Sequence, residues 1–148
     1  MTQKTVIILG YGNLIRGDDG IGPAVATEVE TWKLANVRSL CLHQLVPEVA
    51  EDLSQVDVAI FVDASMTGET IEISPQNPIE TTASNWGHYL NPESLLTLAK
   101  TLYGKAPQAW LISVPGVNFE LCDRLSETAE NGVKLALEEI QTLIQDFI

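Results

Sequence analysis

Cysteine is scarce in this chain of 148 residues, which holds only Cys41 and Cys122. Two cysteines so far apart in the sequence form neither a disulfide framework nor a paired metal-binding motif. We therefore interpret both as buried or half-buried thiols. Long apolar runs are also absent, since none approaches the ~20 residues that cross a bilayer. The first ten residues, MTQKTVIILG, do not resemble a secretory signal, so we expect a cytoplasmic protein without a membrane anchor.

Basic residues are also scarce. The sequence has eight Lys and Arg against twenty Asp and Glu, which gives a net charge of −12. A surface of this sign repels phosphate backbones and argues against a nucleic-acid partner. The charge either serves solubility alone or steers the chain toward a basic patch on a partner. Repeats, linkers and heptads are missing as well, so we expect residues 1–148 to form a single domain that is monomeric.

The hydrophobic pattern alternates between strands and helices. Short apolar, β-branched runs predict strands, and apolar residues at helical spacing after proline or a capping residue predict helices. The predicted strands cover residues 5–9, 37–42, 56–62, 70–73 and 109–114, and residues 75–87 form a polar connection. The predicted helices cover residues 23–34, 47–53, 92–103 and the segment after Ser126, whose apolar stripe is Val133, Leu137, Ile140, Ile144 and Phe147.

This alternation predicts an α/β fold: a mostly parallel or mixed sheet with helices on both faces. In such sheets, ligands bind beyond the carboxyl ends of the strands. Gly10, His43, Asp63 and Pro115 each directly follow a predicted strand. We therefore expect these four residues to face one crevice.

The glycine-rich segment GYGNLIRGDDGIG, residues 10–22, follows the first strand and precedes a helix. It differs from a dinucleotide-binding fingerprint, because Ile15 replaces the third glycine and His43, not an acid, ends the second strand. No Gly-Lys-Ser/Thr follows, so it is not a P-loop either. A nucleotide-binding α/β domain is therefore the less favoured interpretation.

Asp18 and Asp19 stand in this segment, just before the predicted helix. Helix capping explains one aspartate but not two. We expect Asp18 to cap the helix and Asp19 to point into the crevice. Asp63, directly after the third strand, is either a turn residue or a second carboxylate of the same site.

His88 lies in a polar segment before a predicted helix, and His43 is the other histidine of the chain. One imidazole with two carboxylates suits a borderline ion such as nickel, zinc or manganese. His43 is a ligand, a turn residue or a substrate contact, and we favour the substrate contact. The serine-hydrolase motif GxSxG and the zinc-protease motif HExxH are both missing, so hydrolysis would have to run through a metal.

The segment GYGNLIRGDDGIG matches in full the pattern GxGNxxxxDDGxG of the hydrogenase maturation proteases, which the chain resembles. The strand ending in VDAS and the histidine segment before a helix match this family's other two site regions in order. The resemblance implies a mostly parallel sheet flanked by helices. It implies an endopeptidase, without a Ser or Cys nucleophile, whose catalytic and metal-site residues are Asp19, Asp63 and His88.

In this family the enzyme removes a short C-terminal peptide from the large-subunit precursor of a nickel–iron hydrogenase. The nickel belongs to the precursor and serves recognition, so no permanently bound cofactor is expected. The segment His43-Gln44-Leu45 replaces the aspartate-glycine segment of many members and resembles the subgroup that serves bidirectional, NAD-linked hydrogenases. We assign substrate contacts to five residues: Gly10, Gly12, Asn13, His43 and Gln44. A nickel-dependent docking factor that does not cleave is the alternative.

Overall fold

The protein is built around one five-stranded sheet, seen in a computed structural model that describes residues 3–79 and 90–146. The strand order is β2-β1-β3-β5-β4, and every neighbouring pair is parallel except β4 with β5. The predicted α/β fold is thus confirmed, with a mixed sheet. The strands are β1 (Val6–Tyr11), β2 (Val37–Leu42), β3 (Val58–Ser65), β4 (Glu72–Gln76) and β5 (Gln108–Pro115).

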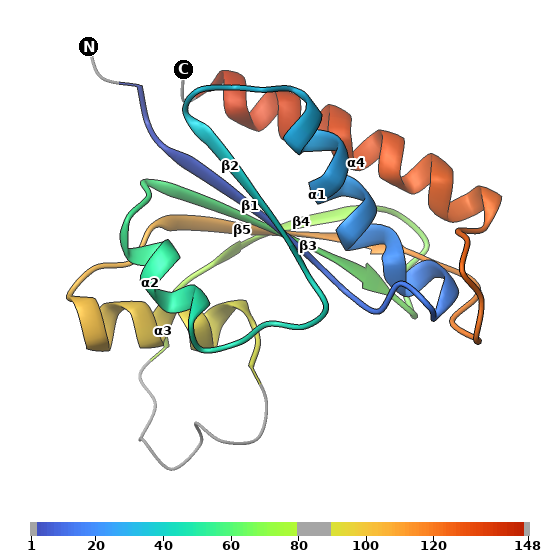
Figure 1. The fold of residues 1–148 in the computed structure, drawn as a ribbon, viewed down its shortest axis with the longest axis horizontal. Helices are drawn as coiled ribbons and strands as arrows, with labels where there is room; N and C mark the ends of the chain where they lie inside the picture. Colours follow the sequence, from blue (N-terminus) through green and yellow to red (C-terminus); the bar gives the residue numbers. More distant parts are fainter. Residues whose placement is uncertain (1–2, 80–89, 147–148) are drawn as a thin grey trace.

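Helices cover both faces of this sheet, as Figure 1 shows: α1 and α4 lie on one face, α2 and α3 on the other. The helices are α1 (Ile21–Thr31), α2 (Val49–Ser54), α3 (Pro92–Tyr103) and α4 (Glu127–Gln145), with a short 3-10 turn, η1 (Gly17–Gly20), before α1. In the part of the chain that the structure describes, no helix is long and apolar enough to cross a membrane.

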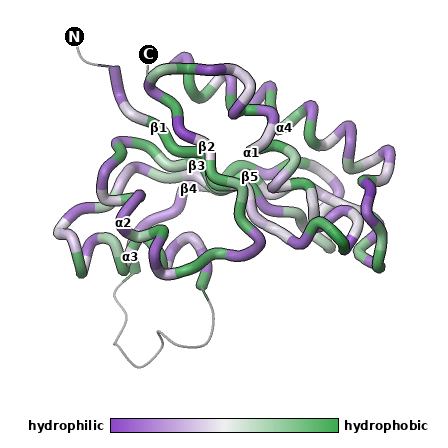
Figure 2. The backbone as a smooth tube through the Cα atoms, in the orientation of Figure 1, coloured by the Kyte–Doolittle hydropathy of each residue, from purple (hydrophilic) through white to green (hydrophobic). Residues whose placement is uncertain are grey.

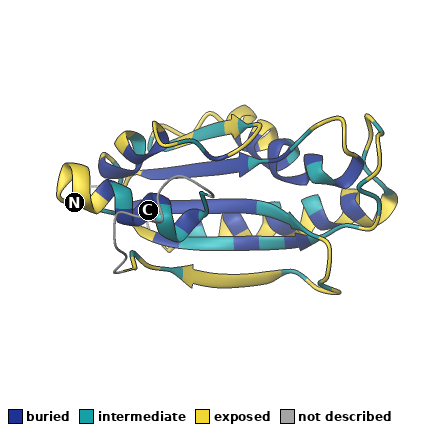
Figure 3. Ribbon diagram, turned by 90° about the horizontal axis from the view of Figure 1, so that it is seen from below, coloured by how far each residue is buried: buried dark blue, intermediate teal, exposed yellow. Residues whose placement is uncertain are grey.

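Alternate residues of the central strands enter separate hydrophobic clusters. In β3, Ile60 packs with α1 and α4, whereas its neighbour Phe61 packs with α2 and α3. This is the two-residue period of a strand buried on both faces. Figure 2 shows hydrophobic residues along the central strands, and Figure 3 shows these strands buried while β4 is exposed.

Several predicted element ends were wrong. The first helix ends at Thr31 rather than near residue 34, because Lys33 has a left-handed backbone with φ 55°. The third strand continues past Asp63 to Ser65, since Ala64 and Ser65 pair with β5. The fourth strand covers Glu72–Gln76 rather than residues 70–73, and it includes Pro75, which the sequence predicts to lie in a polar connection. A proline is tolerated there because β4 is an edge strand.

Helix α4 packs on the sheet through smaller residues than its sequence predicts. The residues buried in this helix are Ala129, Gly132, Ala136, Ile140 and Ile144. A Cβ on Gly132 would lie 2.6 Å from Val114 Cγ1, so the helix approaches β5 too closely for larger side chains there. Of the predicted stripe, Ile140 and Ile144 are buried and Val133 and Leu137 are partly buried, while Phe147 lies outside the described residues.

Candidate functional site

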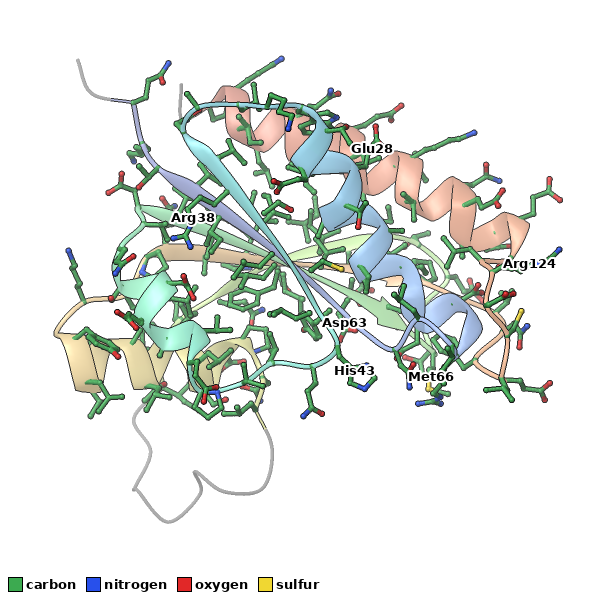
Figure 4. All side chains as sticks on the ribbon, viewed as in Figure 1. Glu28, Arg38, His43, Asp63, Met66 and Arg124 are labelled. Carbon is green, nitrogen blue, oxygen red and sulfur yellow. The ribbon has the colours of Figure 1, made fainter. Side chains whose placement is uncertain are left out.

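The site lies at the carboxyl ends of β1 and β3. Here the connections that leave the two strands lead toward opposite edges of the sheet. From β1 the chain passes through α1 to β2 on one side, then through α2 back to β3 on the other. Such a switch point leaves a crevice in open α/β sheets. Figure 4 shows Asp63, His43 and Met66 at this end of the molecule.

Glycines bring the first turn of α1 against these strand ends. A Cβ on Gly10 would lie 1.9 Å from the Gly22 carbonyl oxygen. A Cβ on Gly22 would lie 2.6 Å from the carbonyl oxygens of Tyr11 and Val62. Only residues without side chains permit these contacts, so glycine at both positions sets where η1 and its two aspartates lie.

Asp19 is held by the loop that precedes it. Its Oδ2 accepts a 2.6 Å hydrogen bond from the Asn13 N–H. Gly12 has φ +152°, and a Cβ there would lie 1.9 Å from the Asp19 carbonyl oxygen. The residues at 12 and 13 therefore fix the backbone and the carboxylate of Asp19 together.

Asp63 lies inside β3, partly buried, opposite Ser113 of β5. The pKa of Asp63 is raised to about 6. Burial is the largest cause, and the negative charge of Asp19 acts in the same direction. Hydrogen bonds from the Ala64 N–H and the Tyr11 side chain act in the opposite direction. The effect of Asp19 means that the structure brings these two predicted site carboxylates together.

Tyr11 is a contact of the site that the sequence interpretation missed. It is the last residue of β1, and its side chain hydrogen-bonds to Asp63. Gly10 pairs with Val62, so the next residues along the two strands are Tyr11 and Asp63. Aligning the ends of the predicted strands, Leu9 with Val62, would have placed Gly10 opposite Asp63, so only the observed register reveals this contact.

Asp18 does not cap the following helix, so that prediction was wrong. The N-cap of α1 is Gly20, without a side-chain hydrogen bond, and Asp18 is fully buried. Its carboxylate accepts hydrogen bonds from the N–H groups of Val117, Asn118 and Ser126 and from the Ser126 hydroxyl, at 2.7–3.0 Å. Burial raises the pKa of Asp18, but these donors outweigh burial and hold it below its usual value. Asp18 thus ties η1 to the segment before α4.

Three of the five predicted substrate contacts line one pocket of about 350 Å³ beside the loop. Gly12, Asn13 and His43 line this pocket. Gln44 is exposed next to His43 but does not line the pocket, and Gly10 is buried inside β1. Cys41 also lines the pocket and is exposed, so the expectation of a buried or half-buried thiol was wrong for Cys41, whereas Cys122 is half-buried as expected.

His88, the third predicted ligand, lies outside the described residues. Across residues 3–79 and 90–146, no group of three or more His, Cys, Asp or Glu side chains is arranged to hold a metal ion. Asp19 and Asp63 are therefore two thirds of the predicted donor set. A pair of neighbouring carboxylates attracts a proton or a cation, since either relieves their repulsion.

Comparison with known proteins gives similarity over nearly the whole chain. A Methanocaldococcus jannaschii protein, provisionally named a hydrogenase maturation protease, is 27% identical over 149 residues, covering 95% of this chain and 96% of its own. No model of a protein family matches the chain.

Solved structures share the fold. The hydrogenase maturating endopeptidase HybD from E. coli superposes with a TM-score of 0.76 at 21% identity, covering 96% of this chain and 93% of its own. The hydrogenase 2 maturation peptidase of a Thaumarchaeota archaeon gives 0.71 at 25% identity, covering 96% and 99%. These likenesses confirm the resemblance that the glycine-rich loop indicated.

Proposed function

Because this chain resembles the hydrogenase maturation proteases in sequence and in fold, we propose that it is an endopeptidase of hydrogenase maturation. Its substrate is the nickel-loaded large-subunit precursor of a nickel–iron hydrogenase, from which it removes a short C-terminal peptide. The observation that carries this proposal is the pairing of Asp19 with Asp63 at the switch point of the sheet.

The donor chemistry suits a nickel ion that the precursor brings with it. Asp19 and Asp63 supply anionic oxygens, and His88 adds an imidazole nitrogen. This set fits a borderline divalent ion and leaves coordination positions for the precursor's own ligands. Since the mutual repulsion of Asp19 and Asp63 is relieved by a cation, a loaded precursor binds more tightly than an empty one.

In the reaction, water attacks the carbonyl carbon of the scissile peptide bond. The water proton passes to a carboxylate, and the carbon–nitrogen bond then breaks as the leaving amine takes a proton. Asp19 or Asp63 can take this proton where one of its two carboxylate oxygens is left free by the nickel. Coordination of the precursor's nickel by the site places the scissile bond within reach, which is an orientation effect.

The first test compares nickel-loaded and nickel-free precursor as substrates, with the mass of the precursor measured before and after incubation. We expect a C-terminal peptide to be lost from the loaded form alone. Equal cleavage of both forms would contradict nickel recognition. Binding of the loaded form with no change of mass would favour a docking factor that does not cleave.

Variants tested in the same assay show which residues belong to the site. Asp19→Asn and His88→Ala each remove one donor and should lower processing of the loaded precursor by at least about a hundredfold. Asp123→Asn is the matched control, because the Asp123 side chain is 88% exposed and lies outside the proposed donor set. Full activity of His88→Ala would remove His88 from the site.

A further inference from the structure

Large apolar side chains are exposed around the candidate site. Leu14 and Ile15 precede η1, Met66 follows β3, and Val117 and Leu121 follow β5; each is between 57% and 83% exposed. We call these five residues the apolar platform. Met66 is labelled in Figure 4, at the same end of the molecule as Asp63. The remaining exposed large apolar residues are spread over other elements.

Backbone hydrogen bonds join the loops that carry the platform. The Cys122 N–H donates to the Ile15 carbonyl at 2.9 Å, and the Gly17 N–H donates to the Cys122 carbonyl at 2.9 Å. On the other side, the Gly116 N–H donates to the Ser65 carbonyl at 2.9 Å. The segment after β5 therefore lies between the other two loops and links them into one surface.

The buried Asp18 carboxylate holds this surface in place. It accepts hydrogen bonds from Val117 N and Asn118 N, and through Ser126 it fixes the end of the segment before α4. The platform is thus formed before any partner arrives. A surface organised in advance loses little conformational entropy on binding.

The charge of the platform differs from that of the chain as a whole. The loops of residues 12–17, 64–68 and 116–126 contain two bases, Arg16 and Arg124, and two acids, Glu120 and Asp123, in a chain with a net charge of −12. These loops are also continuous with Asp19 and Asp63, on η1 and β3. An approaching protein therefore meets acidic surface elsewhere and a neutral, apolar surface beside the acid pair.

We propose that the apolar platform docks an uncharged, apolar stretch of the precursor that adjoins its scissile bond. This inference rests on the proposed function and adds a binding surface to it. The platform supplies affinity through buried apolar area, while the acid pair recognises the metal. Precursor binding should therefore depend little on ionic strength, in contrast to binding through charge.

The test replaces two exposed residues of one loop, in the variant Val117→Ser/Leu121→Ser. Serine keeps the backbone N–H of residue 117, which donates a hydrogen bond to the Asp18 carboxylate. The matched control is Leu102→Ser/Leu135→Ser, on α3 and α4, where the side chains are 61% and 52% exposed. Met66→Ser, in a different loop, is a second variant should the first fail to fold. Kd and KM for the nickel-loaded precursor, kcat and the sedimentation coefficient are measured for each.

We expect the platform variant to raise Kd and KM by about tenfold or more, with kcat within about twofold of the unchanged protein. The control should leave all of these unchanged. If the unchanged chain processes the precursor and the platform variants keep its Kd and KM, the platform proposal fails while the function stands. If sedimentation shows that the unchanged chain is a dimer, and the platform variant is a monomer with the same Kd for the precursor, the platform binds a second copy of this chain instead. If the unchanged chain neither binds nor cuts the precursor, the proposed function and the platform both fail.

Discussion

Asp63 is held in a position that costs the fold free energy. Burial and the charge of Asp19 raise its pKa to about 6, so at neutral pH it is ionised against both effects. A neutral side chain there would be more stable, which makes Asp63 a candidate for a functional residue. Asp18, one residue before Asp19, is the opposite case, with a pKa held low by its donors.

Replacing Asp63 by asparagine should therefore raise stability at neutral pH while abolishing processing. Because the folded pKa is raised, the native state binds its proton more tightly than the unfolded chain does. The cost of ionised Asp63 is thus absent below about pH 4, grows between pH ~4 and ~6, and is full above pH 6. We expect Asp63→Asn to raise Tm by a few degrees at pH 7 and to leave it unchanged near pH 4.

Thermal unfolding followed by circular dichroism from pH 3.5 to 8 measures this dependence. Asp123→Asn provides the comparison, as its exposed carboxylate should give no such pH-dependent gain. A gain of equal size at pH 4 and pH 7 would show that the effect comes from packing rather than from the charge of Asp63.

The two ends of the loop between β1 and α1 are in direct backbone contact, so the loop holds one fixed shape. At Gly12 a side chain would overlap the Asp19 carbonyl oxygen, and the φ of +152° is one that other residues rarely adopt. Gly20, eight positions later, has φ −78°, and a Cβ there would meet nothing closer than 3.5 Å. Two glycines of one motif thus differ in whether the fold requires them.

Alanine substitution should separate these two glycines. Gly12→Ala must move η1 away from β1, so we expect a loss of at least about 2 kcal/mol in the free energy of unfolding and of most processing activity. Gly20→Ala should change stability by less than about 1 kcal/mol and leave the site in place. Urea denaturation with precursor cleavage measures both. Similar losses in the two variants would contradict the backbone contact as the cause.

The molecule has a large excess of acidic over basic residues. With a net charge of −12, the chain has many more acids than bases to pair with them. Within residues 3–79 and 90–146, the salt bridges are Arg38 with Asp52 at 2.7 Å and Arg124 with Asp123 at 3.9 Å. Such exposed pairs add little stability, so repulsion among like charges dominates the surface.

Salt should therefore stabilise the folded protein at neutral pH. Raising ionic strength from about 0.01 M to about 0.3 M shortens the screening length severalfold, and we expect Tm to increase. The gain should vanish near pH 4.3, the isoelectric point of the sequence, where net repulsion disappears. A Tm that falls with salt at pH 7 would mean that attractive ion pairs outweigh the repulsion.

Local signals in the sequence determined the fold class and several elements. Helix α3 begins and ends as predicted, because Asn91 caps it through Ser94 and Gly104 ends it with a left-handed backbone. The second strand, Val37–Leu42, also has its predicted bounds. These features depend on neighbouring residues, which the sequence displays directly. The same holds for the glycine-rich motif, which indicates Asp19, and for the end of the third strand, which indicates Asp63.

Tertiary structure alone decided what depends on residues far apart in the chain. Asp18 is of a residue type that often caps helices, but its donors at Ser126 lie 108 positions away and bind it instead. The contact of Tyr11 with Asp63 and the antiparallel placement of β4 likewise follow from strand order. Sequence spacing cannot show which distant donor or strand lies nearest, because that is set by how the whole sheet packs. The sequence thus indicated the acids of the candidate site, and the fold showed that Asp18 binds the segment before α4 while Asp19 lies near enough to Asp63 to affect its pKa.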